Sequence, residues 1–262
     1  MYSACNHSFV ICAYGESIYL EECIKSLFAQ TVKSNVIVAT STPNEHIIGL
    51  CRKYNLELFV NSNRDGISSD WNFAISCATT GLVTLAHQDD IYKPCYTEYM
   101  LKALNAAKNP LIFSCGYGEL RGTEEVYSNR LLNIKKLLLI PMRAFPQSIA
   151  ARRLSLSFGS PICCPSVTYI RNIIGNNRFK ANYYADLDWE QWETLSKNKG
   201  SFVYCSKPLV LHRIHEESET SKVIGSTGRK NEDYQMFLHF WPKQIAKILS
   251  EVYSKAENSN KL

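Results

Sequence analysis

The chain has 262 residues, of which 45% are hydrophobic, and this length and composition are typical of a folded globular protein with a substantial core. The formal net charge is +5, and the basic residues are spread along the chain, so the sequence gives no reason to expect nucleic acid as a partner. No apolar run is long enough to span a bilayer and no secretory apolar segment follows Met1, so we expect a cytoplasmic protein.

The first part of the chain alternates short apolar runs with segments of helical periodicity. Strands are predicted at residues 8–13, 35–40, 56–60, 81–86 and 111–115, and helices at residues 16–30, 43–54, 67–78 and 95–107. This alternation is typical of βαβ units. We therefore predict an α/β fold with a central, mainly parallel sheet flanked by helices, and an α/β layer of nucleotide-binding type in residues 1–115.

After residue 116 the alternation ends. A Leu-rich segment at residues 131–140 carries Lys135 and Lys136, and it is either a surface that contacts a membrane or a lipid-linked acceptor, or an ordinary helix packed on the core. Later strands are predicted at residues 166–170, 202–205 and 209–211, and helices at residues 188–197 and 235–256. No internal repeat or low-complexity linker interrupts the chain, which favours one domain with an elaborated second half.

The ten cysteines are scattered through apolar segments. In a chain that we expect to be cytoplasmic, this pattern predicts reduced, buried thiols. The adjacent pair Cys163 and Cys164 lacks the spacing of a structural zinc site, so we assign no zinc.

Two adjacent carboxylates, Asp89 and Asp90, follow the predicted strand at residues 81–86 directly. Open α/β sheets bind ligands at the carboxyl ends of their strands, and carboxylate oxygens are the ligands that Mg²⁺ and Mn²⁺ prefer when they neutralise a diphosphate. An acidic loop or a helix N-terminus would explain the pair equally well. The pair by itself leaves both interpretations open.

Three separated segments carry a more specific pattern. The first is FVICAYG at residues 9–15 with YLEECIKSLFAQT at residues 19–31. The second is GISSDWN at residues 66–72, which leads to HQDD at residues 87–90, and the third runs from DWEQW at residues 188–192 to PLVLHRIH at residues 208–215. In this order and spacing they resemble the family 2 glycosyltransferases, which are inverting enzymes with a GT-A fold.

The resemblance implies a GT-A domain at residues 1–220, with a nucleotide-sugar-binding half at residues 1–115, an acceptor-binding half at residues 116–220 and a C-terminal helical extension at residues 221–262. It implies a glycosyltransferase of the hexosyltransferase class that moves a sugar from a nucleotide-diphosphate donor, a UDP-sugar, to a glycan or lipid-linked acceptor. The expected setting is bacterial surface polysaccharide or capsule synthesis, with a peripheral contact at the inner membrane face.

The resemblance also implies a divalent metal, Mn²⁺ or Mg²⁺, held by Asp89 and His215. Asp188 matches the general base of the family, and Asp186 is the alternative if the register shifts; as plain structure, Asp188 would be a helix N-cap. Donor contacts are expected from Ala13, Tyr14, Glu16, Thr40, Ser41, Asn72, His87, Gln88, Asp89, Asp90 and Arg213. Acceptor contacts are expected from Trp189, Ser160 and Pro161, although core packing explains Trp189 equally well.

Two positions depart from the family pattern. Residues 40–42, Thr-Ser-Thr, replace an acidic pair that contacts the nucleobase and ribose, so these contacts must come from hydroxyl or backbone groups. His87 replaces the first Asp of the DxD motif, which leaves the strength of metal dependence open. These losses suit an alternative function, a catalytically weak or inactive partner subunit that binds nucleotide-sugar. A dinucleotide enzyme is disfavoured because no Gly-x-Gly-x-x-Gly follows the first strand.

Overall fold

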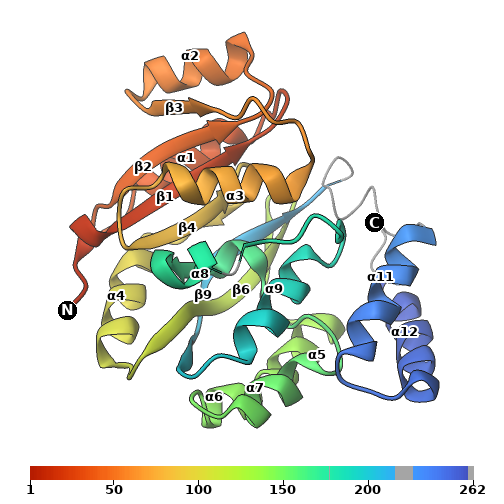
Figure 1. Cartoon of the computed structure of the whole chain (residues 1–262). Coiled ribbons are helices and arrows are strands. Elements are labelled where there is room, and N and C mark those ends of the chain that lie inside the picture. Colours follow the sequence, from red (N-terminus) through yellow and green to blue (C-terminus); the bar gives the residue numbers. More distant parts are fainter. Residues whose placement is uncertain (177, 216–226, 259–262) are drawn as a thin grey trace.

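The computed structural model describes residues 1–176, 178–215 and 227–258 (Figure 1). In these residues a mixed sheet of nine strands has the order β3-β2-β1-β4-β8-β6-β9-β5, with β7 paired to β6. The strands are β1 His7–Ala13, β2 Asn35–Thr40, β3 Glu57–Val60, β4 Leu82–His87, β5 Ile91–Tyr92, β6 Pro110–Arg121, β7 Glu124–Val126, β8 Thr168–Ile170 and β9 Ser201–Ile214.

Helices cover both faces of this sheet and one of its ends (Figure 1). The α-helices are α1 Leu20–Phe28, α2 Glu45–Lys53, α3 Ile67–Cys77, α4 Tyr96–Ala106, α5 Arg130–Leu138, α6 Ile140–Ala144, α7 Ile149–Leu156, α8 Arg171–Asn176, α9 Leu187–Ser196, α11 Thr227–Leu238 and α12 Lys243–Asn258, with short 3-10 turns η1 Ala4–Asn6 and η2 Cys164–Ser166. Among the helices of the described ranges, none combines the length and apolar character needed to cross a bilayer.

Parallel pairing dominates the first half of the sheet. Strand β1 pairs in parallel with both β2 and β4, and β2 pairs in parallel with β3. Strand β8 runs antiparallel between β4 and β6 and so joins this half to the parallel pair β6 and β9. The predicted α/β fold, with a mainly parallel sheet flanked by helices, is confirmed.

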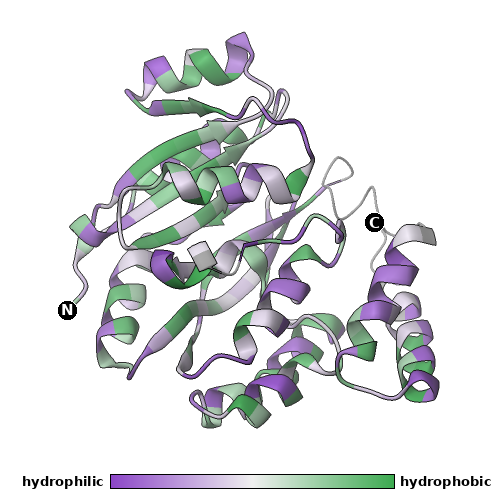
Figure 2. Cartoon of the chain, viewed as in Figure 1, coloured by the Kyte–Doolittle hydropathy of each residue, from purple (hydrophilic) through white to green (hydrophobic). Residues whose placement is uncertain are grey.

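Side-chain alternation along the strands builds two separate cores. Phe9 and Ile11 of β1 belong to the core under α1 and α4, whereas Val10 between them belongs to the core under α3 and α9. Because successive side chains of a strand point to opposite faces, a strand covered on both faces must be apolar throughout. Figure 2 shows that the strands are largely apolar, whereas the helices that flank the sheet carry both polar and apolar residues.

Three predicted boundaries differ from the structure. The first helix begins at Leu20 and not at residue 16, because Gly15 adopts a left-handed conformation with φ +62 and the chain leaves β1 through a loop. The predicted helix at residues 235–256 is two helices, α11 and α12, which are separated at Pro242, a residue that cannot continue a helix. Strand β6 extends from the predicted 111–115 to Arg121 because it pairs with β9 over its whole length.

The C-terminal helices share a core with α9. The ring of Trp189 in α9 packs edge-on against Phe237 of α11 at 5.1 Å between centroids, and it lies 5.6 Å from the ring of Tyr253 of α12. All ten cysteines of the chain are free thiols.

Candidate functional site

The candidate site lies where β1, β2, β4 and β9 end. Parallel register places Ala13 beside Thr40 and Cys12 beside His87, so the carboxyl ends of β1, β2 and β4 meet at one edge of the sheet. Strand β9 reaches the same edge because its residue Leu211 pairs with Ile91, which directly follows the acidic pair. Segments that are more than 120 residues apart in sequence are therefore adjacent here.

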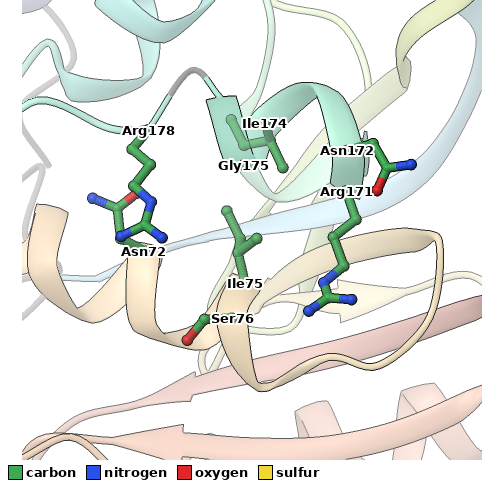
Figure 3. A pocket seen from close by; sticks show the side chains of 8 residues that line it. All are labelled: Asn72, Ile75, Ser76, Arg171, Asn172, Ile174, Gly175 and Arg178. Carbon is green, nitrogen blue, oxygen red and sulfur yellow. The ribbon is translucent and has the colours of Figure 1, made fainter.

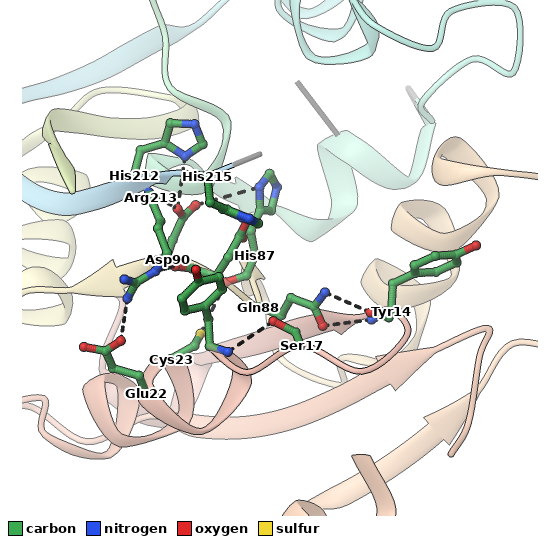
Figure 4. Close-up of polar contacts among 12 residues, drawn as sticks. Tyr14, Ser17, Glu22, Cys23, His87, Gln88, Asp90, His212, Arg213 and His215 are labelled. Atoms are coloured by element: carbon green, nitrogen blue, oxygen red, sulfur yellow. Dashed lines mark hydrogen bonds and ion pairs between the residues drawn. The ribbon is translucent and has the colours of Figure 1, made fainter. Parts of the chain in front are cut away.

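Asp90 joins the loop after β4 to the end of β9 (Figure 4). Its side chain is fully buried, and its Oδ1 accepts hydrogen bonds from the backbone N–H of Arg213 at 2.9 Å and from Nδ1 of His212 at 3.0 Å. Its Oδ2 accepts no hydrogen bond from the residues that the structure describes. Nδ1 of His87 lies 3.9 Å from that oxygen.

Asp89 contacts His215, the residue that follows β9. Its Oδ2 lies 2.8 Å from Nε2 of His215, and its backbone carbonyl accepts a hydrogen bond from Nε of Arg213 at 2.8 Å. Burial opposes ionisation of Asp89, but the hydrogen bond from His215 and the charge of His212 outweigh it, and the pKa of Asp89 lies below its usual value. Asp89 is therefore a carboxylate, with its negative charge available to a cation.

His87, Asp89 and Asp90 form a group that could hold a metal ion. One ligand atom from each lies within 4.8 Å of the others. Burial lowers the pKa of His87 and so keeps its imidazole neutral, and its Nε2 is buried without a hydrogen-bond partner in the described part of the chain. Two carboxylates, a neutral imidazole and two orphaned buried atoms fit a divalent ion such as Mn²⁺.

This group differs from the predicted ligand pair of Asp89 and His215. The structure brings those two residues together as expected, but His215 reaches the metal group through Asp89, while His87 and Asp90 belong to the group itself. The edge of the His215 ring meets the ring of Tyr19, with centroids 4.9 Å apart. His87 was predicted only as a donor contact, and its position at the end of β4 makes it a candidate ligand.

Arg213 is held between the metal group and α1. Its guanidinium is buried, pairs with Glu22 and lies over the ring of Tyr19, with 4.3 Å between Cζ and the ring centroid. Two of its N–H groups are thus used on Asp89 and Glu22, and Figure 4 shows the contact with Glu22. Arg213, which was predicted as a donor contact, therefore lies beside the metal group as a fixed cation.

The loop after β1 is fastened by Gln88. The amide of Gln88 accepts from the N–H of Tyr14 and donates to its carbonyl, each at 2.9 Å (Figure 4). The ring of Tyr14 is 58% exposed and points away from these contacts, Glu16 is exposed, and Ala13 is buried at the end of β1. Gln88 therefore holds the loop, and the Tyr14 ring is the part of it that is open to a ligand.

A carboxylate that sequence reasoning missed lies at the end of β2. Asp70 of α3 accepts a hydrogen bond from the Ser41 hydroxyl at 2.7 Å and from the Asn61 amide at 2.8 Å. Thr40 is buried, and its hydroxyl accepts from the N–H of Thr42 at 3.0 Å. Asp70 thus supplies an acid at a place where residues 40–42 supply none. The only signal for Asp70 in the sequence was its position in the first turn of the helix predicted at residues 67–78.

Asn72 is engaged with the chain itself. Its amide donates to the carbonyl of Phe179 at 2.9 Å and accepts from the N–H of that residue at 3.0 Å. A cavity of about 460 Å³ lies beside it between α3 and α8 (Figure 3), lined by Asn72, Ile75, Ser76, Arg171, Asn172, Ile174, Gly175 and Arg178. No residue of the metal group lines this cavity.

Asp188 is at the start of α9, on the side of the two adjacent cysteines. Its Oδ1 accepts from the N–H of Trp189 at 2.6 Å. Burial raises the pKa values of the Cys163 and Cys164 thiols, and the charges of both Asp90 and Asp188 raise them further. The pKa values of both thiols therefore respond to the charges of both carboxylates.

Asp186, the alternative base, faces α11. It is buried, and burial together with the charge of Asp233 holds its pKa well above the usual value, which favours the protonated form. A protonated carboxyl cannot accept a proton from a substrate. The N–H groups of Tyr184, Ala185 and Asp186 all donate to the carboxylate of Glu232 in α11.

The acceptor contact predicted for Trp189 is wrong. Trp189 is fully buried, and its Nε1 donates to the carbonyl of Leu156 at 3.0 Å, so the ring packs in the core and cannot stack on a sugar. Pro161 is also buried, which leaves it no surface for an acceptor. Ser160 is half-buried, and its hydroxyl has no hydrogen-bond partner among the described residues.

Comparison with known proteins points to one family. Residues 8–172 match the model of glycosyl transferase family 2. No sequence among the curated proteins matches the chain.

Several solved structures share its fold. TarS 1–349 from S. aureus in complex with UDP-GlcNAc is 13% identical, with 98% of this chain and 73% of that chain covered and a TM-score of 0.64. The mannosyltransferase PcManGT from Pyrobaculum calidifontis, in complex with GDP-Man and Mn²⁺, is 13% identical over 98% of this chain and 76% of that chain, with a TM-score of 0.65. Glucosyl-3-phosphoglycerate synthase from Mycobacterium tuberculosis, in complex with Mn²⁺, UDP-Glc and phosphoglyceric acid, is 13% identical over 90% and 80%, with a TM-score of 0.60.

Proposed function

The chain belongs to glycosyl transferase family 2, and from this premise we propose that it transfers a sugar from a UDP-sugar to a hydroxyl of a glycan or lipid-linked acceptor, with inversion. As a member of this family it is a nucleotide-sugar glycosyltransferase with a GT-A fold. One observation carries the proposal: His87, Asp89 and Asp90 lie with one ligand atom each within 4.8 Å of the others, where the parallel strands β1 and β4 end. This group could hold the cation that a leaving diphosphate needs, and Asp188 is the carboxylate that we assign to the acceptor.

The first half of the chain binds the donor in this proposal. His87, Asp89 and Asp90 would hold the divalent ion, which would supply positive charge and Lewis acidity for the leaving diphosphate. Three structural neighbours, TarS, PcManGT and the synthase from M. tuberculosis, were solved with nucleotide-sugars, and the latter two also with Mn²⁺. Tyr14 borders the nucleobase of the donor. Asp70, together with Ser41, faces the nucleoside at the end of β2.

Asp188 acts as the general base. A single displacement needs one carboxylate that takes the proton of the acceptor hydroxyl while the nucleotide leaves from the opposite face of the sugar. Its hydrogen bond from Trp189 N–H uses one oxygen and fixes the carboxylate at the start of α9. A base in such a position contributes about 10²-fold to 10⁴-fold to the rate.

The acceptor side is formed by the second half of the chain. We assign residues 1–115 to the donor, residues 116–220 to the acceptor, and residues 221–262 to a helical extension, of which α11 supports the start of α9 through Glu232. Assembly of a surface polysaccharide such as a capsule, by a cytoplasmic enzyme working at the inner membrane face, is the setting that we propose.

The direct test is transfer from a panel of UDP-sugars with Mn²⁺, read as release of UDP. We expect release with at least one donor, and Asp188→Asn should keep UDP affinity while transfer falls about 10²-fold or more. The matched control is Asp186→Asn, two residues away and turned toward α11, which should retain transfer. Loss of UDP affinity together with transfer in Asp188→Asn would contradict the base role.

The same experiment distinguishes the proposed transferase from the alternative function, a catalytically weak or inactive partner subunit that binds nucleotide-sugar. The replacement of the first DxD acid by His87 favours this alternative, because an imidazole brings no negative charge to the metal. Binding of UDP with Mn²⁺ in calorimetry, with no release from any UDP-sugar, would identify a weak or inactive partner subunit. Absence of both binding and release would contradict the proposed function.

A further inference from the structure

Three neighbouring helices of the acceptor half carry exposed apolar side chains and exposed cations. On α5, α6 and α7, at the lower edge of the molecule in Figure 1, Leu137 is 64% exposed, Ile140 53% and Phe145 67%. Ile134 and Ile149 are also exposed. We call these five residues, together with the exposed cations Arg130, Lys136 and Arg143, the α5–α7 face. Apolar residues exposed in such a cluster mark an interaction surface.

The charged residues of α5, α6 and α7 themselves are all of one sign. No Asp or Glu occurs between residues 126 and 185, a stretch that contains nine Lys and Arg residues. Of the cations in α5 to α7, Arg152 is buried and Arg153 pairs with Glu193, so these two serve the interior. Arg130, Lys136 and Arg143 remain at the surface among the apolar side chains.

We propose that the α5–α7 face docks on an anionic lipid bilayer. Apolar side chains flanked by Lys and Arg bind at the boundary between lipid headgroups and acyl chains. There the apolar side chains enter the acyl region, and the Lys and Arg side chains contact the lipid phosphates. A second copy of the chain is the poorer occupant, because a two-fold interface sets the same patch against itself and would oppose like charges with no carboxylate on α5, α6 or α7 to offset them.

The face lies next to the proposed acceptor site. On α5, Lys135 turns inward, with its Nζ 5.6 Å from the centroid of the Tyr117 ring; burial opposes its charge, but Tyr117 and other neighbours, Asp188 among them, raise its pKa. Helix α7 packs on α9, where the carbonyl of Leu156 accepts from Trp189 and Arg153 pairs with Glu193. Docking would therefore hold the start of α9 near the membrane; in this respect the inference rests on the proposed function and names a lipid-linked acceptor.

The test is sedimentation of the full chain with vesicles of phosphatidylcholine, with or without phosphatidylglycerol. We expect binding to the anionic vesicles, weakened by added salt, and little binding to the neutral ones. Leu137→Asp should reduce the partition coefficient about tenfold or more, because it replaces a buried apolar contact by a charge. The matched control is Ile248→Asp, which makes the same kind of change at a residue of α12 that is 62% exposed, and it should bind as the unaltered chain does.

Two outcomes would overturn the inference. One is equal binding to neutral and anionic vesicles, or an equal loss in Leu137→Asp and Ile248→Asp. The other is light scattering that shows a dimer of the unaltered chain and a monomer of Leu137→Asp, which would assign the face to a second copy. Calorimetry of UDP with Mn²⁺, without vesicles, checks that each variant is folded and tests the proposed function separately from docking.

Discussion

Asp70 shows how a single residue can supply what its neighbours in sequence lack. It is held at the end of β2 by Ser41 and Asn61, and a carboxylate has lone pairs left for a ligand when it accepts two hydrogen bonds. We predict that Asp70→Asn weakens UDP binding about tenfold to a hundredfold, the range of a hydrogen bond to a charged group. Isothermal calorimetry with UDP and Mn²⁺ measures this.

The control for Asp70 is Asp65→Asn, which removes the same charge from an exposed position in the loop before α3. It should leave UDP affinity unchanged. If Asp70→Asn lowers the stability to urea but not the affinity, then Asp70 serves only to fasten β2 to α3.

His7 carries a pH dependence that belongs to the fold and not to the site. It is buried between Ser34 and Thr84, and burial lowers its pKa to about 3 from an unfolded value of 6.5. The neutral form is therefore favoured on folding, so its stabilising effect is complete above pH 6.5 and is lost as the pH falls toward 3. The loss amounts to about 1 kcal/mol for each pH unit.

Urea unfolding of the unaltered chain and of His7→Gln, at pH 7 and at pH 5, measures this effect. The free energy of unfolding of the unaltered chain should fall more steeply between these pH values, by about 2 kcal/mol relative to the variant. Parallel slopes for the two proteins would contradict a neutral, buried His7.

At the scale of elements, α11 positions the start of α9. The carboxylate of Glu232 accepts from the N–H groups of Tyr184, Ala185 and Asp186, which lie two to four residues before Asp188. Removing this acceptor leaves three donors without their partner and lets the base shift. We predict that Glu232→Ala lowers kcat about tenfold or more while UDP affinity is retained, measured by UDP release and calorimetry.

The matched control is Glu251→Ala on α12, which removes an exposed carboxylate of the same C-terminal segment. It should keep the kcat of the unaltered chain. A fall in UDP affinity equal to the fall in kcat would show that Glu232 supports the whole fold and not the base.

Element prediction succeeded where local patterns decide. Strand β2 and helix α3 follow from apolar runs and periodicity, since both are covered by neighbouring elements in the way that their apolar residues require. The predicted start of α1 was wrong because the backbone of Gly15 is bound to the loop between β2 and α2. There Thr42 accepts from the Gly15 N–H and Asn44 donates to the Gly15 carbonyl. Such contacts leave no periodic trace in the sequence.

For the whole molecule, nucleotide and metal should act together on stability. A ligand that binds only the folded chain stabilises it by about 2.7 kcal/mol at a hundred times its Kd. We predict that UDP with Mn²⁺ raises the Tm by roughly 5–10 °C, whereas either one alone has a smaller effect, because the metal group would hold the ion and the ion would neutralise the diphosphate. Differential scanning calorimetry, with EDTA to remove the ion, measures this.

Two variants frame that measurement. Asp89→Ala removes a carboxylate of the metal group and should abolish the joint effect. Asp188→Asn lies on the acceptor side and should keep it. Equal stabilisation of the unaltered chain and Asp89→Ala would contradict the metal site.

The sequence by itself determined the α/β alternation, the family and the acidic pair after β4, because apolar periodicity and short motifs are local properties of the chain. Only the tertiary structure decided that Trp189 lies in the core, that Asp70 meets Ser41, and that Asp90 binds the end of β9. Each of these depends on burial or on a contact between residues far apart in sequence. Side-chain type does not reveal such a partner, because the packing of the whole chain creates it.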